Sequence, residues 1–223
     1  GVWFVFQLWD GGFAVLHPQA GGGVAFFAHI GGFVFGLLTV SLCGCRFSHQ
    51  PIRIGLAGSL SDPVGVPMKR AAELDILVAV HAESEEMTSE LTGEARAAGK
   101  KGVRDYLNSR PVAAELEAIR CAIDSAAETR CRLHIVHVSC GRGVALVAEA
   151  RAQGIDVTCE TCPHYLVLTE QDMERLGAVA KCAPPLRSDD DQRGLRGQLN
   201  NITTVGSDHS PSPPEMKQRE NFF

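Results

Sequence analysis

The chain has 223 residues, of which 45% are hydrophobic and 21% are charged, and its formal net charge is −5. This composition excludes an intrinsically disordered chain, and an acidic balance without a basic patch argues against a nucleic-acid-binding protein. The charge is unevenly distributed, because Asp10 is the one charged residue within positions 1–45. We therefore interpret residues 1–45 and 46–223 as two different kinds of sequence.

Residues 24–42 are uncharged and mostly apolar. Their length approaches the roughly 20 residues that a helix needs to cross a bilayer. Arg46 and Arg53 follow this segment, so the positive-inside tendency places its C-terminal side in the cytoplasm. We expect the segment to associate with a membrane, where an imidazole such as His29 either packs against another helix or faces a polar site.

The string GGGVAFFAHIGGFVFGLL surrounds His29 and resembles the last transmembrane helix of the rhomboid intramembrane serine proteases. The resemblance implies that His29 matches the general base of that family. The GxSG motif that carries the family's serine does not occur in the sequence, and a histidine without its nucleophile cannot transfer an acyl group. We expect residues 1–45 to be a rhomboid-like transmembrane fragment.

Residues 46–63 show no periodicity, and we interpret them as a linker. In residues 64–223, apolar runs alternate with amphipathic stretches. This order predicts an α/β fold with a parallel sheet, either open or closed into a barrel. The expected strands are 76–82, 132–139, 155–161 and 201–208, and the expected helices are 69–74, 85–100, 111–128, 143–153 and 189–200.

Three of the apolar runs end in His81, His137 and Asp208. In α/β barrels the carboxyl ends of the strands carry the functional site. Two imidazoles and a carboxylate suit zinc or another divalent metal, although a histidine at a strand end is also commonly structural. Strand alternation places His134 on the opposite face from His137, so we interpret His134 as structural.

The strings LVAVHAES, LHIVHVS, VTCETCPHYLVLT, AKCAPPLR and GSDHSPSPPEMK resemble the cyclic amidohydrolases, and allantoinases most closely. This resemblance implies strands five to eight of a metal-dependent (β/α)8 barrel that hydrolyses a cyclic amide or ureide, allantoin in the allantoinases. It implies that His81, His137 and Asp208 are metal ligands and that Asp208 is also the general base. The implied cofactor is a divalent metal, zinc first, which forms a binuclear centre in complete members.

Dihydroorotases are the competing family. They carry Asn at the position of Ala183 and another His where this chain has Ser212-Pro213-Pro214, so both departures favour allantoinases. The expected pocket residues are His164, Tyr165, Cys182, Ala183 and His209. For the loop around Cys182, simple turn rigidity remains an alternative.

Part of the family's metal-binding set is absent from the sequence. Complete members use an HxH pair on the first strand and a carboxylated lysine on the fourth, and neither Lys69 nor Lys181 falls at that lysine. No HxH string occurs, and residues 46–223 are too few for a complete barrel of about 250 residues. We therefore expect a composite of a rhomboid tail and about half a barrel, inactive as it stands, from a truncated or mis-assembled gene.

From this interpretation we expect a membrane-associated protein whose C-terminal part lies in the cytoplasm. If the N-terminal segment is an artefact, we expect a cytoplasmic protein. The eight cysteines are scattered along the chain, and we expect them to be reduced. The CxxC of Cys159 and Cys162 lacks the second pair that a zinc ribbon needs. The sequence does not indicate an oligomeric state.

Overall fold

The computed structural model describes residues 52–55, 65–209, 213–217 and 221–223, all of which belong to one compact unit, His49–Phe223. The predictions for residues 1–45, including the membrane span and His29, lie outside these residues. Within the described part of the chain, no helix is long and apolar enough to cross a membrane.

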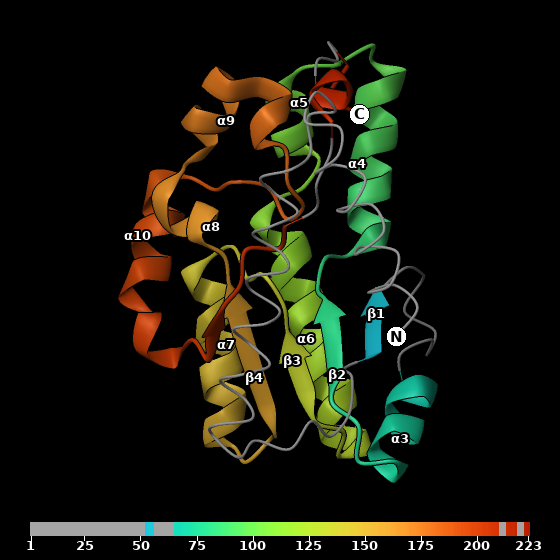
Figure 1. Cartoon of the computed structure of the whole chain (residues 1–223). Coiled ribbons are helices and arrows are strands. Elements are labelled where there is room, and N and C mark those ends of the chain that lie inside the picture. The colour runs from blue at the N-terminus through green and yellow to red at the C-terminus, as the bar shows by residue number, and fades with distance from the viewer. Residues whose placement is uncertain (1–51, 56–64, 210–212, 218–220) are drawn as a thin grey trace, which may run out of the picture. The chain divides into compact units, whose positions relative to one another are not determined.

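Five parallel strands form the sheet, and their spatial order is their order in the sequence (Figure 1). They are β1 (Ile52–Gly55), β2 (Val78–His81), β3 (Leu133–Ile135), β4 (Val157–Thr161) and β5 (Thr204–Val205). Because every strand runs in the same direction, all carboxyl ends lie at one end of the sheet, the upper end in Figure 1. The predicted α/β fold with a parallel sheet is confirmed for the described residues.

Helices connect the strands, as a parallel sheet requires. They are α3 (Gly65–Glu73), α4 (Glu85–Ala97), α5 (Val103–Asn108), α6 (Val112–Thr129), α7 (Gly141–Ala152), α8 (Pro163–Val167), α9 (Glu170–Leu176) and α10 (Asp189–Gly197), with 3-10 turns η1 (Gly177–Ala180), η2 (Leu199–Asn201) and η3 (Pro214–Lys217). In Figure 1, α6 and α7 lie behind the sheet, α10 lies beside β4, and α8 and α9 lie above the upper end of β4.

The face of the sheet that packs on α6 and α7 is apolar. Val78 of β2 lies beside Leu133 of β3, which lies beside Val157 of β4. These side chains are fully buried and belong to one core with Ile119 of α6 and Val144 of α7. The opposite face carries polar groups, because the intervening positions include His134, Thr158 and Glu160.

Helices α7 and α10 approach each other closely at Gly141. A Cβ atom at this position would lie 2.3 Å from the carbonyl carbon of Gly194 and 2.7 Å from the nitrogen of Leu195. Both neighbours are backbone atoms and cannot rotate away, so a glycine is required here. The contact fixes α10, and with it the loop that precedes α10, against the first turn of α7.

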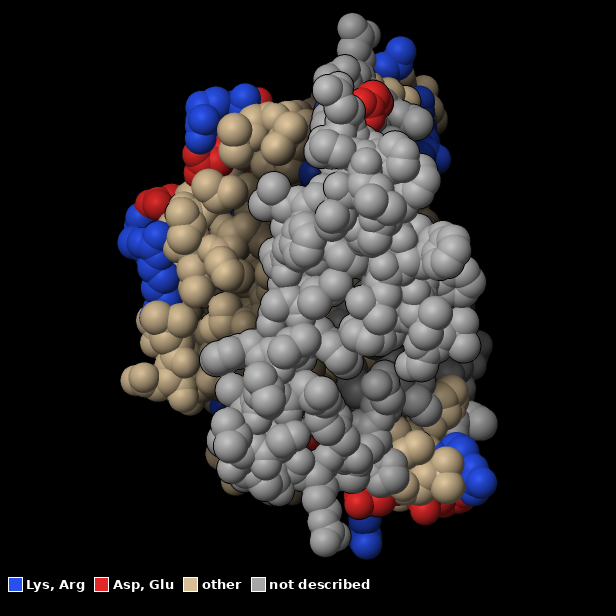
Figure 2. Space-filling view, in the orientation of Figure 1, with Lys and Arg blue, Asp and Glu red and all other residues tan. Residues whose placement is uncertain are grey.

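Charged side chains of both signs gather on the outer surfaces of α9 and α10 (Figure 2). Arg193 pairs with Asp189 and Asp190 on α10, and Arg175 pairs with Asp172 on α9 at 2.8 Å. These are exposed pairs one helical turn apart, and such pairs contribute only a few tenths of a kcal/mol each. Their contribution to the stability of α9 and α10 is therefore small.

Three predictions about strands need correction. Residues 46–63 were expected to lack regular structure, but Ile52–Gly55 forms β1 and pairs with β2. The predicted strand 132–139 ends at Ile135, because His137 has a φ of 41° that breaks the extended conformation. The predicted strand 201–208 is reduced to Thr204–Val205.

Candidate functional site

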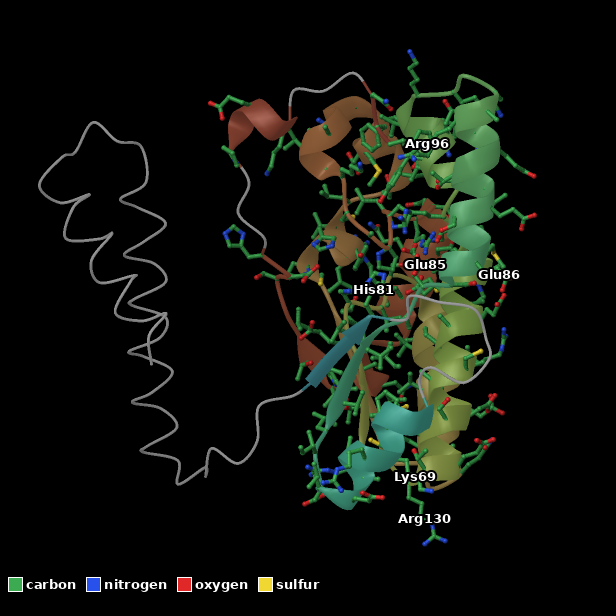
Figure 3. The ribbon with its side chains drawn as sticks, turned by 90° about the vertical axis from the view of Figure 1, so that its right-hand side faces the viewer. Lys69, His81, Glu85, Glu86, Arg96 and Arg130 are labelled. Carbon is green, nitrogen blue, oxygen red and sulfur yellow. The ribbon has the colours of Figure 1, made fainter. Side chains whose placement is uncertain are left out.

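The three predicted ligands lie at the same end of the sheet. His81 is the last residue of β2, His137 comes two residues after β3, and Asp208 comes three residues after β5. Figure 3 shows His81 at this end, while Lys69 and Arg130 lie at the opposite end of the strands. Lys69 lies on α3, the helix that precedes β2, where the sequence predicted a helix.

The two histidines are in direct contact. Nδ1 of His81 lies 3.0 Å from Nε2 of His137, and the rings meet edge to face with their centroids 4.8 Å apart. The side chain of His137 is buried, and its Nδ1 has no hydrogen-bond partner among the described residues. Burial, assisted by the neighbouring His81, lowers the pKa of His137 to about 4, so this imidazole is neutral at pH 7 and keeps a lone pair for binding.

Backbone conformation brings His137 to His81. In the register of β2 and β3, Ala79 lies beside His134, so His81 and His134 share one face of the sheet. Simple alternation from Ile135 would place His137 on the other face. The left-handed φ of 41° at His137 interrupts the alternation, and the ring turns towards His81.

This geometry corrects the prediction that His134 faces away from the site, but it leaves the predicted structural role of His134 in place. His134 faces the same side as His81, and it is nevertheless bound within the sheet, since its Nδ1 lies 2.7 Å from Oγ1 of Thr158. Burial lowers the pKa of His134, and the charge of Glu160 opposes that shift. A structural role for His134 is therefore consistent with its contacts.

Glu83 is a functional candidate that sequence reasoning missed. Its carboxylate is buried, with Oε2 3.6 Å from Nε2 of His81 and hydrogen-bonded to Nη1 of Arg110. Burial raises the pKa of Glu83, but His81 and Arg110 outweigh it and the net pKa is lowered, so the group is a carboxylate. A carboxylate behind one ring nitrogen favours the tautomer that leaves the other nitrogen, here Nδ1, as the acceptor. The spacing H-x-E at residues 81–83 was the available signal.

A second buried network follows His137. Ser139 donates its backbone N–H to Oε1 of Glu115 at 2.7 Å, and its hydroxyl contacts Oε2 of the same carboxylate. Arg187 donates to Oε2 of Glu115 at 2.9 Å and to Oγ of Ser139 at 2.7 Å. All three residues are buried, and none was singled out from the sequence, because their partners are 24 to 72 positions apart.

Asp208 is the third predicted ligand, and its backbone and exposure differ from those of an ordinary strand residue. Its φ is 45°, so it too departs from the extended conformation, and it is exposed. Its charge acts on His137 and His164, since it raises the pKa of both against the effect of burial. His209 is exposed beside it. Across the described ranges, no three His, Cys, Asp or Glu side chains are close enough together to hold a metal ion.

The predicted pocket residues follow β4 or precede α10. His164 lies in the first turn of α8, half-buried, and its Nε2 has no hydrogen-bond partner among the described residues. Tyr165 is buried and donates its hydroxyl to the carbonyl of Pro184 at 2.7 Å, a structural contact rather than a free pocket group. The carbonyl of Cys182 accepts from Tyr106 at 2.9 Å.

The described cysteines form no disulfide bonds with one another. Burial raises the pKa of Cys182 to about 11 and that of Cys162 to about 12, so both remain protonated at pH 7. A protonated thiol is a poor metal ligand. Ala183 lies half-buried in the same loop, and Ser212 is outside the described residues.

The geometry fits two ligands of a divalent metal. Zinc binds imidazole nitrogens at about 2.0–2.1 Å, so two nitrogens 3.0 Å apart can share one ion. One of these imidazoles is held neutral by burial, and a carboxylate lies behind the other. His81 and His137 therefore fit a metal, and Asp208 follows β5, which β4 separates from β3 in the sheet.

Comparisons with known proteins show which proteins the chain is similar to. No family model matches the chain. Allantoinases from Deinococcus radiodurans and Rubrobacter xylanophilus are each 56% identical over 158 residues, which is 70% of this chain and 35% of the relative. The chain thus spans about a third of the length of these relatives. They are not rhomboid proteases, so the rhomboid resemblance of residues 1–42 stays a prediction.

Solved structures give the architecture. The L-hydantoinase of Arthrobacter aurescens matches with a TM-score of 0.70 and 38% identity, over 74% of this chain and 39% of that chain. The dihydropyrimidinase of Brevibacillus agri matches with a TM-score of 0.67 and 37% identity, over 72% and 37%. A dihydroorotase from Campylobacter jejuni, at 17% identity and a TM-score of 0.54, shows the same fold alone. The described part of the chain is therefore an allantoinase-like segment with the fold of part of a cyclic amidohydrolase.

Proposed function

We propose that residues 64–223 form part of the active site of a cyclic amidohydrolase that opens the ring of a cyclic ureide such as allantoin. The observation that carries this proposal is the contact between His81 and His137 at the carboxyl ends of neighbouring strands. The chain is 56% identical over 158 residues to an allantoinase, and this similarity supports allantoin ahead of other ring substrates.

In this proposal His81 and His137 hold a divalent metal, with zinc as the first candidate, and Asp208 lies on the side of the site where β5 ends. A metal held there would supply Lewis-acid chemistry, which would lower the pKa of a bound water and polarise the ring carbonyl. The chain's own groups then have separate tasks. Burial keeps His137 neutral, Glu83 orients His81, and Asp208 is the group available to accept a proton.

His164 and the loop of Cys182 and Ala183 are proposed to face the substrate. The unpaired Nε2 of His164 is a buried polar atom that a ureide carbonyl could satisfy. Ala183, where dihydroorotases carry an asparagine, offers no side-chain donor for an acidic ring substrate. His209 is a further candidate contact, next to Asp208 in the sequence.

The chain by itself is expected to show no hydrolysis of allantoin, with zinc, manganese or cobalt added. Members of this family use an HxH pair and a lysine from other strands, and the sequence contains no HxH string. The second, membrane-bound interpretation through residues 24–42 and His29 is not favoured, because the similar proteins are allantoinases.

A chimera tests the proposal directly. Residues 64–223 replace the matching segment of the Deinococcus radiodurans allantoinase, and hydrolysis of allantoin, hydantoin and dihydroorotate is compared. We expect hydrolysis of allantoin in preference to the other two, and its loss in the chimera with Asp208→Asn or His137→Ala. His134→Gln is the matched control and should retain activity. A folded, metal-loaded chimera that leaves allantoin intact would contradict the proposal.

A further inference from the structure

The buried guanidinium of Arg187 is connected by hydrogen bonds to the surroundings of both histidines of the site. Arg187 is in the loop before α10 and is 6% exposed. Its hydrogen bonds run in two directions, one towards the chain that follows His137 and one towards the chain that holds His81. We propose that Arg187 is a positioning residue that fixes His137 and His81 relative to each other. The inference rests on the proposed function, in which these two histidines bind one metal.

The first branch ends at the backbone beside His137. Arg187 donates from Nε to Oγ of Ser139 at 2.7 Å and from Nη2 to Oε2 of Glu115 at 2.9 Å. Glu115 in turn accepts the backbone N–H of Ser139 at 2.7 Å. Ser139 is thereby held at both its backbone nitrogen and its hydroxyl, two residues after His137.

The residue between them is fixed as well. The N–H of Val138 donates to the carbonyl of Glu160 at 2.7 Å, and its carbonyl accepts from Oγ1 of Thr161 at 2.7 Å. With Val138 bound to β4 and Ser139 bound to the Glu115–Arg187 pair, the chain has little freedom to relax. These bonds maintain the left-handed φ of His137, a conformation that persists only where the surroundings impose it.

The second branch ends at His81. Nη1 of Arg187 donates to the carbonyl of Arg110 at 2.6 Å. The side chain of Arg110 donates a hydrogen bond to Oε2 of Glu83. This Oε2 atom also lies 3.6 Å from Nε2 of His81. Arg187 therefore fixes the residue that fixes Glu83, and Glu83 sets the orientation of the His81 ring.

A purely structural role explains this network poorly. Buried ion pairs contribute little to stability compared with apolar packing, because both charges must be desolvated. A planar fork with three bonds in three directions instead specifies one geometry. Lysine could retain the charge of Arg187 but could not make all three bonds in these directions.

The variants for the test are made in the full chain. Arg187→Met removes the charge and all three bonds at similar volume, and Arg187→Lys keeps the charge alone. Gln192→Met is the matched control, since it removes a buried side-chain bond to the carbonyl of Leu168, at 2.8 Å, outside the network. His81→Gln and His137→Gln assign the two ring signals.

The first readout uses no metal. In chains labelled with ¹⁵N-histidine, Arg187→Met should shift the ring-nitrogen signals of His81 and His137 and leave that of His134, which is bound to Thr158. Gln192→Met should leave all three in place. Unchanged signals for His81 and His137 in Arg187→Met, or an equal shift of His134, would overturn the inference.

The second readout is cobalt binding, followed by its visible absorption. Arg187→Met should weaken binding by roughly 10–100-fold, the usual effect of losing a group that orients a metal ligand. Arg187→Lys should fall between Arg187→Met and the wild type, and Gln192→Met should bind as the wild type does. Equal binding by Arg187→Met and the wild type would overturn the positioning role and leave the proposed metal site intact. A wild type that binds no cobalt would instead contradict the proposed function, while the ring signals still decide the role of Arg187.

Discussion

His81 and His137 face each other with 3.0 Å between Nδ1 of the first and Nε2 of the second, although they are 56 positions apart. The contact depends on one backbone feature, the φ of 41° at His137, because strand alternation alone would separate the two rings. The left-handed conformation occurs again at Asp208, with a φ of 45°. Asp75 and Arg130 also have a positive φ without being predicted ligands, so the conformation alone does not mark the site.

The buried imidazole of His137 makes the stability of the metal-free chain depend on pH. Its folded pKa is about 4, compared with 6.5 for the unfolded chain. Between these two pKa values the unfolded state binds more protons than the folded state. The contribution of neutral His137 to the free energy of unfolding is therefore fully present above pH 6.5 and is lost as the pH falls towards 4. Urea unfolding with a chelator present should show a free energy of unfolding about 2 kcal/mol lower at pH 5 than at pH 7.5.

The variant His137→Gln isolates this effect. It should reduce the difference between pH 7.5 and pH 5, because the group with the depressed pKa is gone. His209→Gln, at an exposed position, should retain the wild-type pH dependence. If His137→Gln leaves the pH dependence unchanged, His137 is not buried in its neutral form.

Removing either Glu115 or Arg187 alone should strongly destabilise the folded protein. Glu115→Ala leaves the buried guanidinium without its carboxylate, and such a change destabilises a protein by about 3–5 kcal/mol. The double variant Glu115→Ala with Arg187→Met removes both charges and should be destabilised by less than the sum of the single variants. Urea denaturation of the four proteins measures this difference. Additive effects would mean that the two charges do not interact.

Two glycines at the α7–α10 contact should respond in opposite ways. A Cβ at Gly141 would lie 2.3–2.7 Å from backbone atoms of Gly194 and Leu195. Gly141→Ala should therefore lower the free energy of unfolding by about 1–3 kcal/mol or more. Gly194→Ala has nothing within 4 Å of its new Cβ and lies within a helix, so it should raise stability by about 0.5–1 kcal/mol.

Thermal unfolding of both variants measures this contrast. Equal effects of the two substitutions would show that the helices do not approach as closely as 2.3 Å implies.

The sequence predicts the fold well where its patterns are local. The apolar runs that became β2 and β4 and the amphipathic periods of α4, α6 and α7 lie where they were expected, within a few residues. The runs ending in His81 and His137 also predicted the end of the sheet at which the site forms. Hydrophobic periodicity records which face of an element is buried, and that information is contained within a few neighbouring residues.

The remainder of the site was not predictable in this way. A left-handed φ at His137 has no composition signal, because the residue is neither glycine nor asparagine. The bonds that connect Arg187 with Ser139, Glu115 and Arg110 span 48 to 77 positions and join four different elements or loops. Such contacts depend on tertiary packing, and only the assembled sheet brings their partners together.

Metal binding by the full chain is the most direct test of the proposed site at His81 and His137. Cobalt or zinc is titrated into the metal-free full chain, and the affinity is compared with those of His81→Ala, His137→Ala and His134→Ala. We expect His81→Ala and His137→Ala to weaken binding by more than the roughly 10–100-fold that follows loss of an orienting group, while His134→Ala binds as the wild type does. Wild-type affinity in both His81→Ala and His137→Ala would contradict the proposed site.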